Sequence, residues 1–403
     1  MSSAAAAFPG DPVARAPSRN VLAFAAVAAM TFSASSSAPT PVYHLYQDSL
    51  GLSHLMLTVV FAVYAFSLLA GLLTVGSISD YVGRRPVAFA ALILNAAAMA
   101  LFVTGGSTAV LIAARAVQGL ATGAALTTLA AAILDIDRER GPIVNSITPF
   151  IGLSVGSLGA GVLVTFAPAP EQLVFAVLLV LSFLLAGLVL LMPETTTPRP
   201  GALAALRPHV RVPPQARRAL VLVTPLNVAG WALGGFYFSL MPSLVRETSG
   251  LIAPLVGGAV VASLTLTATM TVLAIRTWPA ERILAAASPL LALGVAISLL
   301  GVHQHQVTLL FIGTVVAGLG FGGAYSGTFR TVVPLAAPTE RAGLLSAYFV
   351  QSYLAFSLPA ILAGVAAPHL GLAVTSYFYG AAAILLALAS LVAGRVERRF
   401  AQQ

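Results

Sequence analysis

The sequence predicts an all-α membrane protein with twelve transmembrane helices in two six-helix pseudo-repeats. Three observations support this fold class. Hydrophobic residues make up 59% of the 403 residues and charged residues only 8%, and the mean hydropathy is +0.96, which is more apolar than a soluble chain can bury. Apolar runs of about 20 residues, long enough to cross a bilayer, recur along the chain. A glycine pattern in the fourth run returns in the tenth.

The apolar runs alternate with short polar gaps, which favours helices over the shorter strands of a barrel. The predicted spans of the first half are residues 21–43, 55–78, 86–104, 108–134, 143–166 and 172–192. Those of the second half are residues 219–243, 251–275, 282–301, 307–333, 343–366 and 372–393. The spans define an N-terminal bundle over 21–192 and a C-terminal bundle over 219–393, with a Pro- and Arg-rich linker over 193–218 and tails over 1–20 and 394–403.

The arginine distribution predicts the orientation of these spans. Positively charged residues stay on the cytoplasmic side, and with both termini cytoplasmic all but two of the 20 arginines fall on that side. The exceptions are Arg115, inside the fourth span, and Arg246. We therefore expect a multi-pass protein of a bacterial-type inner membrane. The net charge of +8 follows from this topology, and we expect no nucleic-acid partner.

Two residue types are absent, and their absence excludes several chemistries. Without cysteine the chain has no disulfide, thiolate nucleophile or cysteine zinc site. Without lysine it has no phosphate-binding loop of the type that ends in Gly-Lys-Ser/Thr. We predict that the protein is not an enzyme, holds no cofactor or metal, and takes any driving force from a gradient or a partner.

The polar gap after the second span contains the sequence Gly-x-x-x-Asp-x-x-Gly-Arg-Arg. Gly76 allows a neighbouring helix to approach, and Asp80 follows one turn later. Gly83 permits a turn with positive φ, and Arg84 and Arg85 anchor the third span on the cytoplasmic side. The pattern resembles the signature loop of the major facilitator superfamily of secondary transporters.

This resemblance implies that Asp80 latches the cytoplasmic side by meeting the start of the eleventh span, near Ala342 in the other half. Such a contact would favour an outward-facing state. The alternative is a charged loop that only fixes the topology. The corresponding loop of the second half, residues 276–282, has neither the glycine nor the aspartate.

Arg115 lies about 10 Å inside the fourth span, where its burial costs at least a few kcal/mol. With Gln118, Gly119 and Gly123 it resembles the fourth-helix motif of the same family, in which the arginine is associated with proton coupling and the glycines with tight packing. In one interpretation Arg115 binds an anion or tunes a proton site. In the other it holds helices together through backbone carbonyls and Gln118.

The glycine pair of the fourth span returns in the tenth as Gly318 and Gly322, 199 residues later. This repetition predicts that the halves are tandem copies in parallel orientation around a central cavity.

The fifth span contains Gly152, Gly156, Ser157 and Gly161, a run that partly resembles the Gly-x-x-x-Gly-Pro-x-x-Gly-Gly motif associated with antiporters. Ser157 replaces the proline, and Ala160 replaces a glycine. The resemblance favours export. The alternative is a seam of small residues that packs two helices closely.

The positions of the acidic residues give little support to proton coupling. On the predicted boundaries only Asp80 and Asp135 approach a span end, so the coupling expected of the family lacks an obvious titrating group.

Neutral polar and aromatic residues at cavity positions suit a neutral or amphipathic ligand, although each such residue also fits a packing or interfacial role. They are Asn95, Asn227, Trp231, Tyr237, Tyr325, Tyr348, Gln351 and Tyr353.

The resemblance as a whole implies a secondary active transporter that works by alternating access. The favoured function is proton-linked efflux, or antiport, of a small amphipathic or neutral molecule. The alternatives are an uptake permease or facilitator for a neutral metabolite and, more remotely, a non-transporting membrane receptor or scaffold. The expected partners are the small-molecule substrate, protons and membrane lipid, and we expect a monomer.

Overall fold

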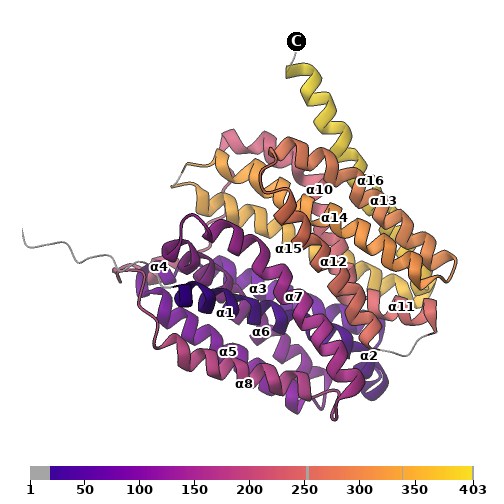
Figure 1. The fold of residues 1–403 in the computed structure, drawn as a ribbon, viewed down its shortest axis with the longest axis horizontal. Helices are drawn as coiled ribbons and strands as arrows, with labels where there is room; N and C mark the ends of the chain where they lie inside the picture. The colour runs from indigo at the N-terminus through magenta and orange to yellow at the C-terminus, as the bar shows by residue number, and fades with distance from the viewer. Residues whose placement is uncertain (1–18, 251–253, 338, 402–403) are drawn as a thin grey trace, which may run out of the picture.

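The computed structural model describes residues 19–250, 254–337 and 339–401, and every regular element assigned there is helical. Figure 1 shows the first half, in indigo to magenta, beside the second half, in orange to yellow. The first half comprises α1 (Arg19–Ser37), α2 (Pro39–Leu50), α3 (His54–Thr74), α4 (Ser79–Val82), α5 (Arg84–Thr104), α6 (Thr108–Ile136), α7 (Gly141–Phe166) and α8 (Leu173–Val189). The remainder comprises α9 (Ala202–Ala205), α10 (Pro214–Ser239), α11 (Met241–Ser249), α12 (Pro254–Ala274), α13 (Ala280–His303), α14 (Val307–Val332), η1 (Val333–Leu335), α15 (Arg341–Leu370) and α16 (Leu372–Ala401).

The helices follow the twelve predicted spans in order. Eleven helical stretches in the described part of the chain are long and apolar enough to cross a membrane, and α8 is a shorter apolar helix of 17 residues. The first stretch, Asn20–Leu50, includes both α1 and α2. The all-α fold of two six-helix halves is confirmed.

Two spans are broken at equivalent places, which the sequence boundaries did not include. The first span continues to Leu50 after a turn at Ala38, and the seventh continues into α11 after Ser239. Proline follows each break, at Pro39 in α2 and at Pro242 in α11. Proline fits the first turn of a helix, where its missing N–H is not needed, and so starts a new segment after each bend.

The linker and the tails also differ from the predicted boundaries. The linker contains the short helix α9, and α10 begins at Pro214 rather than at residue 219. Helix α16 continues to Ala401 because Arg, Glu and Ala support a helix beyond its apolar part; its end projects from the bundle in Figure 1. The predicted N-terminal tail and the start of the eighth span fall on residues 1–18 and 251–253, which lie outside the described residues.

Close glycine contacts hold matching helix pairs together in the two halves. A Cβ on Gly123 of α6 would lie 2.3 Å from the Leu68 carbonyl oxygen of α3. In the second half, a Cβ on Gly322 of α14 would lie 2.6 Å from the Ala268 carbonyl oxygen of α12. Contacts shorter than 3.0 Å leave no room for a side chain, so the repeated glycines do the same packing in both halves.

The two halves meet along a seam formed by two helix pairs, α3 with α15 and α7 with α12. Side chains of both halves mix there in apolar clusters. One cluster joins Phe61 of α3 to Phe238, Val261 and Ala360 of the second half. Elsewhere, larger clusters lie within each half. Each half therefore has apolar clusters of its own, and smaller mixed clusters join the halves at the seam.

Candidate functional site

The bundle has two chemically distinct ends. The arginine-rich end carries the connections at Arg84, Arg138, Arg282 and Arg341, and the opposite end carries the connections at residues 51–53, 105–107, 167–172 and 304–306. In Figure 1, α4 lies at the arginine-rich end, and α2 and α11 lie at the opposite end.

The loop after α3 has the backbone that its glycine predicts. Gly83 has φ of 105°, and a Cβ there would lie 2.5 Å from a carboxylate oxygen of Glu194. The positive φ requires glycine, and the absence of a side chain lets the Glu194 carboxylate approach. Gly76 lies against α6 of its own half, where a Cβ would lie 3.2 Å from Cγ2 of Thr127.

Glu194 was not among the predicted site residues, yet its side chain fixes the start of α5. The backbone N–H groups of Arg84 and Arg85 donate to its two carboxylate oxygens at 2.8 Å and 3.0 Å. A carboxylate at this position satisfies unpaired N–H groups and complements the positive end of the helix dipole. The available signal was an acid directly after the last span of the half, on the side that carries the arginines.

The guanidinium of Arg84 binds two acids of this end. It pairs with Asp80 at 2.5 Å and with Asp135, at the end of α6, at 3.2 Å. It also donates to the Ser79 hydroxyl at 2.7 Å. The sequence predicts Asp80 and Asp135 near the ends of two different spans, and in the structure both carboxylates pair with Arg84.

The predicted contact between Asp80 and the start of α15 is not formed in this conformation. Asp80 is bound to Arg84, and the linker occupies the first turn of α15, where the backbone N–H of Arg211 donates to the Gly343 carbonyl at 3.2 Å. The linker also reaches the first half, because the backbone N–H of Arg199 donates to the Tyr81 carbonyl at 2.8 Å. The latch stays a prediction for a state in which the halves are arranged differently.

Arg115 is fully buried, and its guanidinium joins α6 to the first span. Nε donates to the Tyr43 hydroxyl at 3.1 Å, and Nη1 donates to the Ser36 carbonyl at 3.0 Å and to Oε1 of Gln118 at 2.7 Å. The guanidinium also lies 5.0 Å from the ring centre of Tyr64. Its partners are hydroxyl, carbonyl, amide and aromatic groups, with no carboxylate among them.

These contacts favour the helix-joining interpretation of Arg115. Four of its five N–H groups are already used, since Nη2 also donates to the Tyr43 hydroxyl. Gln118 extends the connection by donating to the Ser35 carbonyl at 2.7 Å. A role of Arg115 in anion binding or proton coupling stays a prediction.

The small residues of α7 face two different neighbours. A Cβ on Gly152 would lie 2.5 Å from the Met30 carbonyl oxygen of α1, and a Cβ on Gly156 would lie 2.2 Å from the Ala34 carbonyl oxygen. One turn later, the facing contact is with the other half. A Cβ on Gly161 would lie 3.1 Å from Cα of Leu255 in α12.

Ser157 also lies on the seam and is fully buried. A Cβ on Gly258 of α12 would lie 2.4 Å from the Ser157 carbonyl oxygen. The run that partly resembles an antiporter motif therefore packs α7 on α1 inside its half and on α12 across the seam. Close approach of backbones is what small residues permit in membrane helices.

Most polar contacts between helices of the two halves lie at the opposite end, and one more, between the hydroxyls of Ser154 and Thr265 (2.6 Å), lies midway along α7 and α12. Those at the opposite end come mainly from α2 and α11, the segments that follow the two equivalent breaks. The contacts there join the Thr40 hydroxyl to the Phe238 carbonyl (3.0 Å), the Ser243 hydroxyl to Gln47 (3.3 Å), Arg246 to Asp48 (3.6 Å) and the Leu255 backbone N–H to Thr165 (3.2 Å). Together with the close contact at Gly258, they hold the halves against each other at this end.

Four of the residues predicted to line a cavity are instead packed within one half. Asn95 is fully buried and donates to Ser35 and Ser182. The others are Asn227 bonded to Ser352 (3.0 Å), Tyr237 bonded to Thr314 (2.9 Å) and Tyr348 bonded to Thr328 (2.8 Å), all at most 2% exposed. In this conformation these four side chains expose almost no surface to a ligand, and they pack within the core of their own half.

The other four predicted cavity residues lie at or near the seam. Trp231 and Tyr353 pack together with ring centres 5.0 Å apart, in a cluster that includes Leu68 of α3. Tyr325 meets Phe150 of α7 edge to face at 5.1 Å. Gln351 is half-buried, and its amide nitrogen has no hydrogen-bond partner among the described residues. Three of these four side chains are aromatic and pack against other apolar groups at the seam.

Acidic side chains are missing from the buried residues in the described part of the chain. No group of three or more His, Cys, Asp and Glu that could hold a metal ion is found over the same residues. A titrating carboxylate deep in the membrane helices is therefore not available among them to carry a proton.

Comparison with known proteins agrees with this architecture. Residues 24–364 match the model of the Major Facilitator Superfamily. The chain is similar to the curated "Multidrug resistance protein MdtL" of Klebsiella pneumoniae, with 25% identity over 291 residues that cover 69% of this chain and 73% of that protein.

Solved structures share the fold at low sequence identity. The nucleoside transporter NupG has a TM-score of 0.70 and 12% identity, covering 92% of this chain and 99% of that chain. The xylose transporter XylE from E. coli, in a partially occluded inward open conformation, has a TM-score of 0.69 and 13% identity, covering 91% and 97%. The human organic anion transporter MFSD10 has a TM-score of 0.64 and 19% identity, covering 93% and 99%.

Proposed function

The chain belongs to the major facilitator superfamily, and we propose that it exports a small amphipathic or neutral molecule in exchange for protons by alternating access. The observation that carries this proposal is the seam. Two halves with separate cores contact each other at the opposite end through α2, α7 and α12. Rocking of the halves breaks these contacts without disturbing either core.

The direction and the substrate class rest on three further observations. The small residues of α7 lie on the seam, in the run that partly resembles an antiporter motif. The relative MdtL is named for multidrug resistance. Aromatic side chains packed at the seam, including Trp231 and Tyr353, suit an apolar or amphipathic molecule once the halves separate. The positive-inside rule supports a cytoplasmic location for the arginine-rich end.

A second candidate is facilitated diffusion of a neutral metabolite. No Asp or Glu is among the buried side chains of the described residues. This absence favours the facilitator, because a proton antiporter needs a titrating group along the transport path.

Transport by purified protein in liposomes tests both candidates. With an acidic lumen, protein-containing liposomes are expected to accumulate a fluorescent amphipathic dye such as ethidium above the level of protein-free liposomes, and a protonophore is expected to abolish the difference. Equilibration without accumulation would support the facilitator. Concentrative accumulation that survives the protonophore would remove proton coupling. No protein-dependent movement of any compound in a chemically diverse panel would contradict transport itself.

A further inference from the structure

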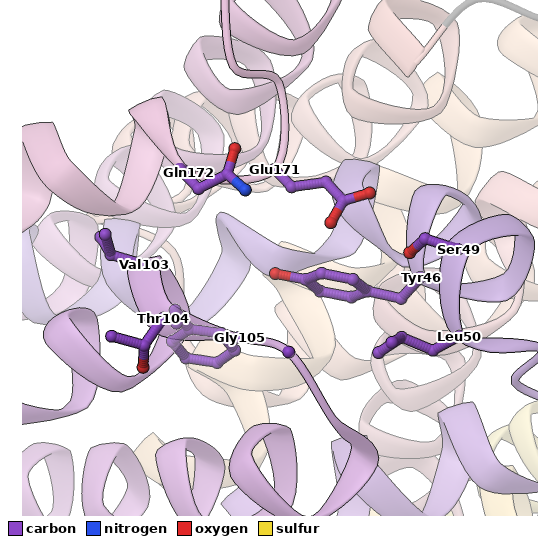
Figure 2. A pocket seen from close by; sticks show the side chains of 10 residues that line it. Tyr46, Ser49, Leu50, Val103, Thr104, Gly105, Glu171 and Gln172 are labelled. Carbon is purple, nitrogen blue, oxygen red and sulfur yellow. The ribbon is translucent and has the colours of Figure 1, made fainter.

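A cavity of about 200 Å³, open to the surface, lies in the first half at the end opposite the arginine-rich end. Its walls come from α2, from the end of α5 with the turn that follows, and from the turn before α8. Figure 2 shows these segments with their side chains around the cavity. The seam helices α12 and α15 contribute none of the lining residues, so this cavity is separate from the seam.

Tyr46 of α2 supplies an unsatisfied polar group to this cavity. Its side chain is 1% exposed, and its hydroxyl has no hydrogen-bond partner among the described residues. In Figure 2 the ring lies across the cavity with the hydroxyl directed toward its interior. A buried hydroxyl without a partner is unfavourable. A bound molecule with a hydrogen-bond donor would satisfy it.

Glu171, in the turn before α8, is a carboxylate at the same cavity. It is half-buried, and its side chain makes no ion pair or hydrogen bond with any described residue. Figure 2 shows its carboxylate close to the Tyr46 ring, on the cavity side. A partly buried carboxylate without a counterion attracts a cation and strengthens any hydrogen bond that the cation donates.

The remaining walls suit an organic cation better than a bare metal ion. Phe102 is held rigidly by stacking on Phe175 at 4.4 Å, and Leu50 adds apolar surface. Aromatic rings attract ammonium groups through their negative faces. The volume equals about seven water molecules at about 30 Å³ each, which suits a small amine.

We propose that this cavity binds an ammonium group. The ammonium donates to the Glu171 carboxylate and to the Tyr46 hydroxyl oxygen, and the carbon skeleton of its carrier rests on Phe102 and Leu50. The carrier is either a soluble organic amine or the amine of an ethanolamine lipid headgroup, because both present the same chemistry. The site does not depend on the proposed transport function, and binding tests it without transport.

Binding of 4-fluorobenzylammonium, followed by fluorine NMR of the purified full-length protein in phosphatidylcholine nanodiscs, tests the proposal. We expect saturable binding that Glu171→Gln weakens by about tenfold or more and Tyr46→Phe weakens by about threefold, since each removes one acceptor and keeps the volume. The matched control is Glu139→Gln, which changes an exposed acid at the arginine-rich end and is expected to leave binding unchanged.

The neutral analogue 4-fluorobenzyl alcohol requires no variant and is expected to bind at least tenfold more weakly. Ethanolamine lipid in the nanodiscs separates the two carriers: competition with the probe identifies the lipid amine as occupant, and unchanged binding identifies a soluble amine. The proposal is overturned if Glu171→Gln binds the probe as tightly as the natural protein, or if the alcohol binds as tightly as the amine.

Discussion

Gly258 lies at a tightly packed point of the contact between the halves. Its missing side chain lets α12 approach α7, because an added Cβ would lie 2.4 Å from the Ser157 carbonyl oxygen. Ordinary van der Waals contact for a Cβ begins at 3.4 Å, so Gly258→Ala requires the backbones to separate by about 1 Å. The facing atom belongs to the main chain and cannot rotate away, unlike a side-chain end.

The cost of this substitution falls on the conformation in which the opposite end is closed. Overpacking of this kind costs about 1–3 kcal/mol, which changes the ratio of two conformations by about 5-fold to about 150-fold. The gain in helix propensity from Gly to Ala is about 1 kcal/mol, but it is present in every conformation and cancels from the ratio. Gly258→Ala is therefore expected to shift the protein toward forms in which the opposite end is open.

Cysteine labelling measures the shift, because the natural chain has no cysteine. Ala360, fully buried in the seam cluster with Phe61 and Phe238, serves as the reporter after Ala360→Cys. A water-soluble maleimide is expected to react at least fivefold faster when Gly258→Ala is also present. Gly159→Ala is the matched control, since a Cβ at Gly159 of α7 meets nothing within 4 Å. Equal rates for both glycine variants would refute the reasoning.

Three further substitutions test the arginine-rich end and the buried arginine. Asp80→Asn is expected to shift the population toward forms open at the arginine-rich end, because the latch to α15 loses its charge; unchanged cysteine labelling at both ends would count against the latch. Glu194→Gln removes the charged cap of α5 and is expected to lower stability by about 0.5–2 kcal/mol, seen as a lower melting temperature that Glu139→Gln does not reproduce. Arg115→Lys cannot bridge all of the arginine's partners at once and is expected to cost about 1–3 kcal/mol; a melting temperature equal to that of the natural protein would contradict the helix-joining role.

Much of the fold was readable from the sequence because membrane helices obey two simple constraints. Their length matches the bilayer, and their apolar runs must satisfy every backbone group within the helix. The repeated glycines Gly119/Gly318 and Gly123/Gly322 predicted matching helix pairs because only glycine allows contacts of this closeness. Apolar length alone does not indicate the breaks after Ser37 and Ser239; their sequence signals are Pro39 and Pro242.

The candidate site was less predictable, because its contacts join residues far apart in sequence. The position of Glu194 after the last span of its half indicates its end of the bundle, but not that it caps a helix beginning 110 residues earlier at Arg84. Similarly, Asn95 and Tyr237 suit a cavity by residue type, yet hydrogen bonds to Ser35 and Thr314 turn both into packing groups. Composition shows which side chains are polar, and only the fold shows which of them are already satisfied.

Pulsed electron paramagnetic resonance tests alternating access most directly. It measures distances between spin labels across both ends of the bundle in the same protein preparation. Exposed pairs of label positions span the halves at each end: Pro170 with Gln304 at the opposite end, and Arg138 with Thr277 at the arginine-rich end. The account predicts reciprocal changes, so that forms with a longer distance at the opposite end have a shorter distance at the arginine-rich end. A single unchanging distance at both ends, with and without a transported compound and a proton gradient, would contradict it.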